Sequence, residues 1–233
     1  IFLGWYDAAG RGDASATYDG HHIQKLNPAN GDRQWSYYLS TLKGGGDSWI
    51  GLEPLPDGSV LALFYFREIA DFGNGIATPD AENETGVMAR IASDGSVQRL
   101  EQLKSLINPP YNQGNNISLN IKGMSSVKDD KFLLAGSFYG DITLNNGGAL
   151  TGEKLNGVLA GEDVLVIELD TMLNIQGTLQ AGSNSRDRSF GVSWSNRGTV
   201  WTTGDFQTNS VAMFAEPIAF GMTSFSSAGK NDV

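Results

Sequence analysis

The sequence predicts an all-β fold built from repeated four-stranded antiparallel sheets, and three observations predict it. Thirty glycines, 40% apolar residues and only 18% charged residues in a chain of 233 describe a folded protein dense in turns. Three sixteen-residue stretches align with one another without a gap. A second pattern, which reads strand, turn, strand, recurs between these stretches.

The three aligned stretches are predicted to be β-hairpins. They cover residues 51–66, 123–138 and 191–206, and each runs from a Gly to a Phe. In each stretch a half-apolar segment leads into a polar turn, and an apolar strand follows that ends on the Phe.

The start of the chain fits the second strand of the same hairpin. In this alignment Gly4 takes the place of Gly136 and Gly204, and Tyr6 takes the place of the closing Phe residues. The first unit is therefore expected to begin in mid-hairpin.

The second recurring element covers residues 20–39, 86–103 and 162–179. Each copy reads strand, short turn, strand, and the first strand ends on Leu26, Ile91 or Leu169. Four strands per unit, with the variable connection after the second strand, is typical of β-propeller blades.

We therefore predict about three and a half blades, with unit boundaries at roughly 1–46, 47–118, 119–186 and 187–233. Both ends of the sequence fall inside a unit. We expect the chain to be part of a larger propeller, completed by the remainder of a longer polypeptide or by other protein subunits.

Several short motifs carry a family resemblance. They are "FGMTSFSSAGKNDV" (220–233), the Lys-Leu ending of residues 19–26, and "GDRQW" (31–35) followed by "GGGDSWIGL" (44–52). The repeat resembles the bacterial β-propeller repeats called SBBP repeats, and it departs from them where Glu168 replaces the Lys and Arg99 replaces a Trp. The resemblance implies a secreted or cell-surface bacterial protein that acts as a spacer or binding module, with no shared catalytic motif.

Composition excludes several classes of function. Sixteen basic and twenty-six acidic side chains give a net charge of −10, which repels nucleic acid and anionic lipid surfaces. The chain has no Cys and two His, which leaves little material for a zinc site or a His-based triad. No apolar run approaches the ~18 residues of a membrane-spanning helix, so we expect no membrane insertion.

We predict no catalytic, cofactor-binding or metal-binding residues. Arg11-Gly12-Asp13 is interpreted as a solvated turn, with a cell-adhesion motif as the alternative. His21 and His22 are neighbours in a strand, so they point to opposite faces and do not share one metal. The carboxylates of residues 80–84, with Glu68 and Asp71, are interpreted as a solvated acidic loop, and the alternative is a calcium site.

An enzyme of the propeller type would need a pair of carboxylates in the channel lined by the first strands. Those strands offer Glu53, but Ser125 and Ser193 at the two equivalent positions. Asp47 and Asp187 correspond to each other, while Leu119 takes that place in the middle unit. No pair is evident, so we do not expect an enzyme.

The five tryptophans are the remaining candidates for binding. Most sit at alternating strand positions, where packing between blades is the favoured role and stacking on sugar is the alternative. They are Trp5, Trp35, Trp49, Trp194 and Trp201.

The sequence thus predicts a non-catalytic extracellular or surface scaffold. Its long connections, roughly 67–84 and 139–160, would be presented for protein or carbohydrate binding. Two alternatives stay open. One is a propeller glycoside hydrolase or polysaccharide lyase, and the other is a subunit of a surface filament or layer whose blades are completed between copies.

Overall fold

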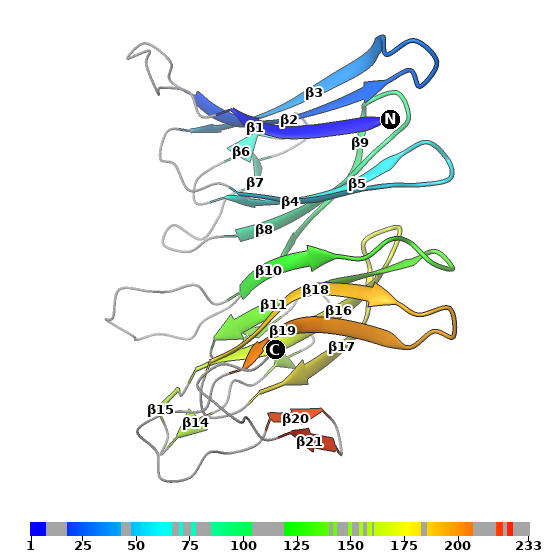
Figure 1. Cartoon of the computed structure of the whole chain (residues 1–233). Helices are drawn as coiled ribbons and strands as arrows, with labels where there is room; N and C mark the ends of the chain where they lie inside the picture. Colours follow the sequence, from blue (N-terminus) through cyan, green and yellow to red (C-terminus); the bar gives the residue numbers. More distant parts are fainter. Residues whose placement is uncertain are drawn as a thin grey trace. The chain divides into compact units, whose positions relative to one another are not determined.

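The computed structural model in Figure 1 describes residues 1–7, 18–42, 48–66, 70–71, 76–77, 85–103, 119–139, 142–143, 149–150, 154–155, 158–159, 161–182, 186–206, 218–220 and 223–225. None of these residues lies in a helix, which confirms the prediction of an all-β chain. The chain divides into two compact units, Ile1–Leu103 and Lys104–Val233.

The first unit holds two antiparallel sheets. One has the strand order β1-β2-β3-β6-β7, and the other has the order β4-β5-β8-β9. Their strands are β1 (Phe2–Asp7), β2 (Tyr18–Leu26), β3 (Arg33–Leu42), β6 (Ala70–Asp71) and β7 (Ile76–Ala77), then β4 (Ser48–Pro54), β5 (Val60–Phe66), β8 (Thr85–Ile91) and β9 (Val97–Leu103).

The second unit holds a four-stranded sheet, a two-stranded hairpin and three short strand pairs. The sheet has the order β10-β11-β16-β17, and the hairpin is β18-β19. The strands are β10 (Leu119–Met124), β11 (Lys131–Tyr139), β16 (Glu162–Asp170), β17 (Ile175–Ala181), β18 (Asp187–Trp194) and β19 (Val200–Phe206). The short pairs are β12 (Ile142–Thr143) with β13 (Ala149–Leu150), β14 (Lys154–Leu155) with β15 (Val158–Leu159), and β20 (Ile218–Phe220) with β21 (Thr223–Phe225).

All three predicted hairpins form, as β4-β5, β10-β11 and β18-β19. Their registers agree as well, because each has one unpaired residue in its first strand directly before the aligned glycine. These glycines are Gly51, Gly123 and Gly191. An extra residue of this kind is a β-bulge, which bends its strand and increases the local twist. The three hairpins are therefore geometrically equivalent.

The turns follow from their residues. In residues 55–59 the Leu55 N–H donates to the Ser59 carbonyl, the Gly58 N–H donates to the Leu55 carbonyl, and Gly58 has a φ of 79°. The same bonds close residues 92–96 and 195–199, again with a left-handed glycine. This conformation favours glycine because the residue lacks a Cβ.

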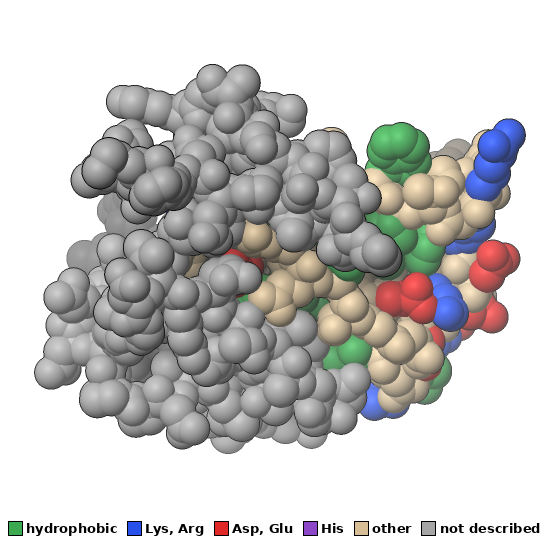
Figure 2. Space-filling model, turned by 90° about the horizontal axis from the view of Figure 1, so that it is seen from below, with side chains coloured by type: hydrophobic (Ala, Val, Ile, Leu, Met, Phe, Trp, Pro, Cys, Tyr) green, Lys and Arg blue, Asp and Glu red, His purple; other side chains and the backbone are tan. Residues whose placement is uncertain are grey.

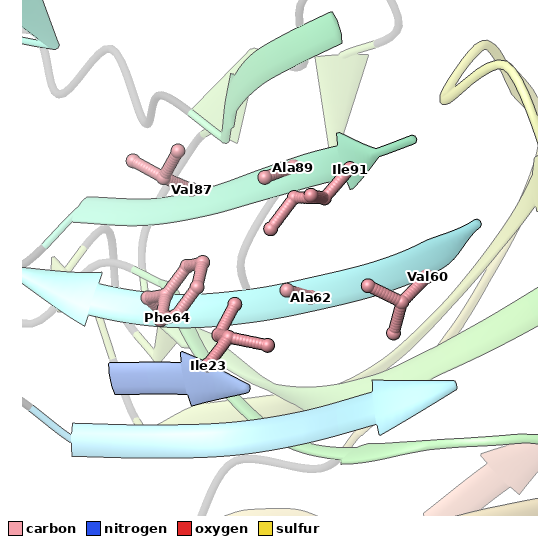
Figure 3. Close-up of a cluster of buried hydrophobic side chains, with 7 residues drawn as sticks. All are labelled: Ile23, Val60, Ala62, Phe64, Val87, Ala89 and Ile91. Carbon is pink, nitrogen blue, oxygen red and sulfur yellow. The ribbon is translucent and has the colours of Figure 1, made fainter. Parts of the chain in front are cut away.

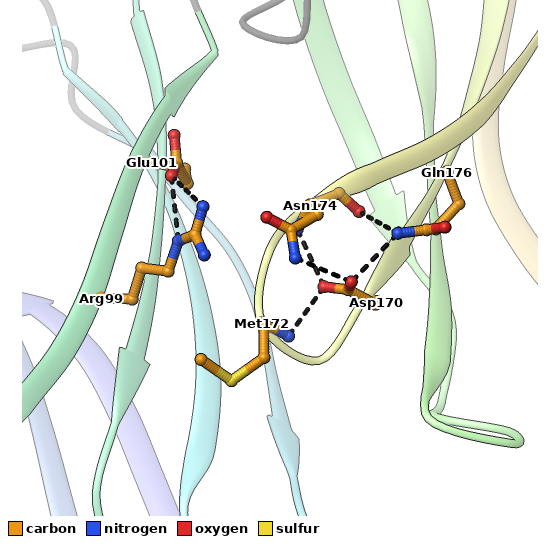
Figure 4. A network of polar contacts seen from close by, with 6 residues as sticks. All are labelled: Arg99, Glu101, Asp170, Met172, Asn174 and Gln176. Carbon is orange, nitrogen blue, oxygen red and sulfur yellow. Dashed lines mark hydrogen bonds and ion pairs between the residues drawn. The ribbon is translucent and has the colours of Figure 1, made fainter.

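The turn after β16 has the same backbone pattern without the glycine. Leu173 has a φ of 66°, and its side chain is buried. Figure 4 shows how Asp170 holds this turn. Its carboxylate accepts hydrogen bonds from the Met172 and Asn174 N–H groups, both at 2.9 Å, and from the side chains of Asn174 and Gln176. Side-chain hydrogen bonds of this kind compensate for a strained backbone.

In the first unit the two large sheets pack face to face. Ile23 of β2 lies against Val60, Ala62 and Phe64 of β5, and Val87, Ala89 and Ile91 of β8 complete the cluster (Figure 3). At one end, the Lys25 ammonium donates to the Gly58 and Ser93 carbonyls, both at 3.1 Å. The Trp35 indole N–H also donates to the Ser93 carbonyl, at 2.8 Å. Apolar burial and these turn contacts together fix the stacking.

In the second unit the β18-β19 hairpin packs on the four-stranded sheet in the same way. Val192, Trp194 and Val200 lie against a cluster formed by Leu133, Ala135 and Val166. The Lys128 ammonium donates to the Ser195 carbonyl of the facing turn at 2.9 Å. Stacked antiparallel sheets are thus present in both units.

Two expectations about the first sheet are wrong. Ladder pairing places Gly4 opposite Ile23, whereas Gly136 lies opposite Leu165. Counted from the strand ends at Leu26 and Leu169, Trp5 and not Gly4 is in the register of Gly136.

The second difference concerns residues 70–77, which were expected to belong to a variable connection of the second predicted unit. Here β6 pairs with the outer edge of β3 and extends the first sheet. An unpaired strand edge offers a row of N–H and C=O groups that a nearby segment can bind.

Candidate functional site

The outer face of the β18-β19 hairpin is the most exposed aromatic surface that the structure describes. Val192, Trp194 and Val200 point to the neighbouring sheet, so the alternate residues Ser193, Trp201 and Thr203 point away from it. Trp201 is 64% exposed, the largest exposed fraction among the described large hydrophobic side chains.

Phe190 joins this face through the bulge in β18. The register shifts between Ser189 and Gly191, which leaves Phe190 unpaired and 46% exposed. The guanidinium carbon of Arg188 lies 5.2 Å from the centre of the Phe190 ring. This distance is in the range of a cation–π contact.

Arg188 forms a bidentate ion pair with Asp205. Its Nε donates to Oδ1 of Asp205 at 3.2 Å, and its Nη2 donates to Oδ2 at 2.8 Å. These hydrogen bonds raise the pKa of the Arg188 guanidinium above its ordinary value, against a smaller opposing effect of burial.

Glu162 adds a second carboxylate at the same end of the sheets. Its Oε2 lies 3.9 Å from the Arg188 Nε and accepts a long hydrogen bond, 3.5 Å, from the Ser137 hydroxyl. Arg188, Asp205 and Glu162 are all partly exposed. The hairpin thus presents two exposed aromatic rings, and at its end Arg188 is held between Asp205 of β19 and Glu162 of the neighbouring sheet.

Figure 2 shows one face of the molecule, on which acidic and basic side chains of the described residues lie close together with single hydrophobic side chains between them. Among those residues, charges of one sign do not gather into a separate patch on this face.

The three residues considered for a catalytic channel differ in their surroundings. Glu53 is half-buried in β4. The Ser125 hydroxyl is buried, accepts the Leu133 N–H at 2.8 Å and donates to the Ser126 carbonyl, so it shapes the hairpin end. Ser193 lies exposed on the outer face.

Asp187 and Leu119 occupy equivalent places, as predicted, opposite Phe206 and Phe138. Both side chains are buried. Asp47 lies outside the described residues, so its equivalence with Asp187 stays a prediction.

Several predicted features fall outside the described residues. They are Arg11-Gly12-Asp13, the acidic residues 80–84 and Glu68, and the side chains of Asp71 and His21. His22 is half-buried in β2, which pairs on both sides. Within the described ranges no group of three or more His, Cys, Asp or Glu side chains could hold a metal ion.

The tryptophans divide into two groups. Trp35 and Trp194 pack against the neighbouring sheet, which confirms the predicted role for them. Trp201 packs against no neighbouring sheet among the described residues, because its position in the alternation places it on the outer face. The side chains of Trp5 and Trp49 are not among those that the structure describes.

Sequence reasoning missed the Arg188–Asp205 pair. The alignment did hold a signal for this face, because Trp201 and Asp205 stand where β11 has Leu133 and Ser137, both of which are buried. When a position that is buried in one hairpin holds a larger or a charged residue in the equivalent hairpin, the second hairpin is expected to expose that face.

Comparison with models of known protein families and with curated proteins finds no match to this chain. No described helix is long and apolar enough to cross a membrane.

Proposed function

We propose that this chain is a non-catalytic scaffold of the β-propeller type, from an extracellular or cell-surface bacterial protein, and that it binds carbohydrate on the outer face of β18-β19. Its sheets stack in both units, as propeller blades do. The motifs shared with SBBP repeats support the same class of protein.

The observation that carries the proposal is the exposed Trp201 on the paired β18-β19 hairpin. An indole exposed to water lowers the solubility of the protein. Its aromatic plane matches the apolar C–H face of a sugar ring. Phe190 lies two to three residues away along the hairpin, which is about 7 to 10 Å at the rise of a strand. The two rings can therefore contact neighbouring sugars of one chain.

The polar groups beside the rings favour an uncharged polysaccharide. The Arg188 guanidinium is already bound to Asp205, and Glu162 lies on its other side. Three charged groups with one excess negative charge repel an anionic polymer, while their remaining N–H donors and carboxylate lone pairs can bind hydroxyl groups.

Affinity electrophoresis through gels that contain a soluble neutral β-glucan, α-glucan or mannan tests the proposal. We expect at least one of these polysaccharides to retard the wild-type chain, and Trp201→Ala to abolish the retardation. Leu179→Ala is the matched control, because Leu179 is another exposed apolar side chain of the same unit, on β17. Equal mobility of wild type and Trp201→Ala in all three gels would contradict carbohydrate binding at this face.

The non-catalytic part has its own test. Glu162 and Asp205 approach the same guanidinium, and paired carboxylates are what glycoside hydrolases use. We expect no release of reducing sugar from the retarding polysaccharide. Release that is lost in both Glu162→Gln and Asp205→Asn would show an enzyme instead.

A further inference from the structure

The third hairpin differs from its two equivalents at one cross-strand pair and at the bulge beside it. The same pair position holds Ser48 with Tyr65 in β4-β5, Asn120 with Ser137 in β10-β11, and Arg188 with Asp205 in β18-β19. In the same order, the bulge residue is Ile50, Lys122 or Phe190. Of the three hairpins, β18-β19 alone therefore combines a cation, a carboxylate and an aromatic ring at these positions.

The bulge gives the Phe190 ring little support from its own strand. Phe190 has no partner residue in the ladder, and nearly half of its side chain is exposed. An exposed side chain keeps rotamer freedom, and a ligand that stacks on it must remove this freedom at a cost in affinity. The position of the ring therefore depends on its contacts with other side chains.

Arg188 supplies such a contact. Its guanidinium carbon lies over the Phe190 ring, 5.2 Å from the ring centre. A cation at this distance is attracted to the face of the ring and limits its motion. The exposed part of the ring is left for contact with a sugar.

Asp205 in turn fixes the orientation of Arg188. Its Oδ1 and Oδ2 accept hydrogen bonds from Nε and Nη2 of Arg188, at 3.2 and 2.8 Å. A bidentate pair fixes the plane of the guanidinium as well as its position. Glu162 adds a second carboxylate 3.9 Å from the same Nε. The contacts thus run from Asp205 through Arg188 to the Phe190 ring.

We propose that Arg188 and Asp205 are positioning residues, which hold the Phe190 ring as a second stacking position beside Trp201. This inference rests on the carbohydrate binding proposed above. A sugar chain that contacts both rings gains affinity because the second contact is made within the same complex, whereas a single sugar contacts one ring. The site should therefore favour internal segments of a chain over single sugars.

The positioning step is tested by NMR in the free protein. Protons of the Arg188 side chain near the face of the Phe190 ring take a ring-current shift, which Phe190→Ala removes. We expect Asp205→Asn to remove most of this shift, although it leaves the ring in place, because a neutral amide cannot form the bidentate ion pair. Glu168→Gln is the matched control, because it alters another ion pair of the same unit, with Lys131, and should keep the shift. A wild-type shift in Asp205→Asn would overturn the positioning role.

The effect on binding is tested by calorimetry with cellohexaose, maltohexaose and mannohexaose. For a hexasaccharide that binds wild type, we expect Arg188→Met and Phe190→Ala each to lower the affinity about tenfold. The double variant should lose no more than either single variant, because Arg188 acts through Phe190. The amide spectrum of each variant shows whether β18-β19 remains folded. If Arg188→Met does not fold, Arg188→Lys takes its place, because an ammonium cannot form the two parallel hydrogen bonds.

The outcomes separate this inference from the proposed function. Additive losses in the double variant would mean that Arg188 binds the sugar directly, and would overturn the positioning role. Affinity that neither single variant changes would overturn the second stacking position and leave carbohydrate binding at Trp201 intact. No binding of any hexasaccharide to wild type would overturn this inference, and equal mobility of wild type and Trp201→Ala in the polysaccharide gels would overturn the proposed function as well.

Discussion

Strands β11 and β19 occupy the same place in two equivalent hairpins, yet their surroundings differ. From Phe132 to Phe138 every side chain of β11 is buried, on both faces of its sheet. In β19 the residues at alternate positions, Trp201 and Thr203, are exposed. A strand buried on both faces reads as a continuous apolar run, and a strand covered on one face alternates. One backbone geometry therefore forms a buried interior strand in one case and a strand with one exposed face in the other.

The largest effect should come from truncating the interior strand. Leu134→Ala removes a fully buried side chain and should lower the free energy of unfolding by about 3 kcal/mol. The equivalent Thr202→Ala should cost only about 1 kcal/mol, since it loses hydrogen bonds of a partly exposed hydroxyl. Urea denaturation measures both, and equal losses would remove the contrast between the two strands.

A second pair of substitutions tests what the hairpins share. A Cβ at Gly136 would collide with the Asn120 carbonyl oxygen, and one at Gly204 would collide with the Arg188 carbonyl oxygen. Each Gly→Ala change should destabilise the chain by about 2 to 3 kcal/mol. Gly177→Ala is the control, because the space around Gly177 is open and alanine should be neutral or slightly stabilising there. A tolerated alanine at Gly136 would contradict the bulge geometry.

The turns give a smaller effect of opposite sign. Asp129 and Asp130 have φ values of 51° and 59° and form the two-residue turn between β10 and β11. Such a turn favours glycine at its second position. Asp130→Gly should therefore raise the free energy of unfolding by about 0.5 to 1 kcal/mol, because the relief of strain exceeds the entropy cost. A lower midpoint in urea would be the opposite result.

The smallest predicted effect is a pH dependence of the turn at residues 55–59. Hydrogen bonds from the Ser59 hydroxyl and N–H, followed by the contribution of Arg90, lower the pKa of Asp57 below its ordinary value of 3.8. A carboxylate with a lowered pKa stabilises the fold above pH 3.8, and this contribution is lost as the pH falls through the lowered value. Because Asp57 is largely exposed, solvent screening keeps the effect below about 1 kcal/mol.

Asp57→Asn should weaken the dependence of the free energy of unfolding on pH below about pH 4. At neutral pH it should change the free energy of unfolding by less than about 1 kcal/mol. The turn at residues 195–199 is a natural comparison, since Ser195 caps it with a hydroxyl that does not titrate in this range. An unchanged acid slope in Asp57→Asn would contradict the assignment.

Sequence reasoning found the hairpins because their turns carry Gly, Asp and Asn at fixed places. It did not find the bulges, because the unpaired residues are Ile50, Lys122 and Phe190, which share no chemistry. It also missed the pairing of β6 with β3, since a two-residue strand has no periodicity to detect.

The candidate site was only partly visible in the sequence. Alternation shows that Trp201 and Thr202 point to opposite faces, but the face that a neighbouring sheet covers depends on tertiary packing. The Arg188–Asp205 pair joins residues seventeen positions apart and becomes apparent only once the register of β18 and β19 is known.

Hydrogen exchange at three equivalent amides tests the central claim most directly. Ala62 and Leu134 bond to third strands β8 and β16, while Thr202 faces the edge of β19 beside which the described residues place no further strand. In the free chain we expect the Ala62 and Leu134 amides to exchange only through unfolding, and the Thr202 amide to exchange orders of magnitude faster. Protection of Thr202 equal to that of Leu134, or rapid exchange of all three, would contradict this account.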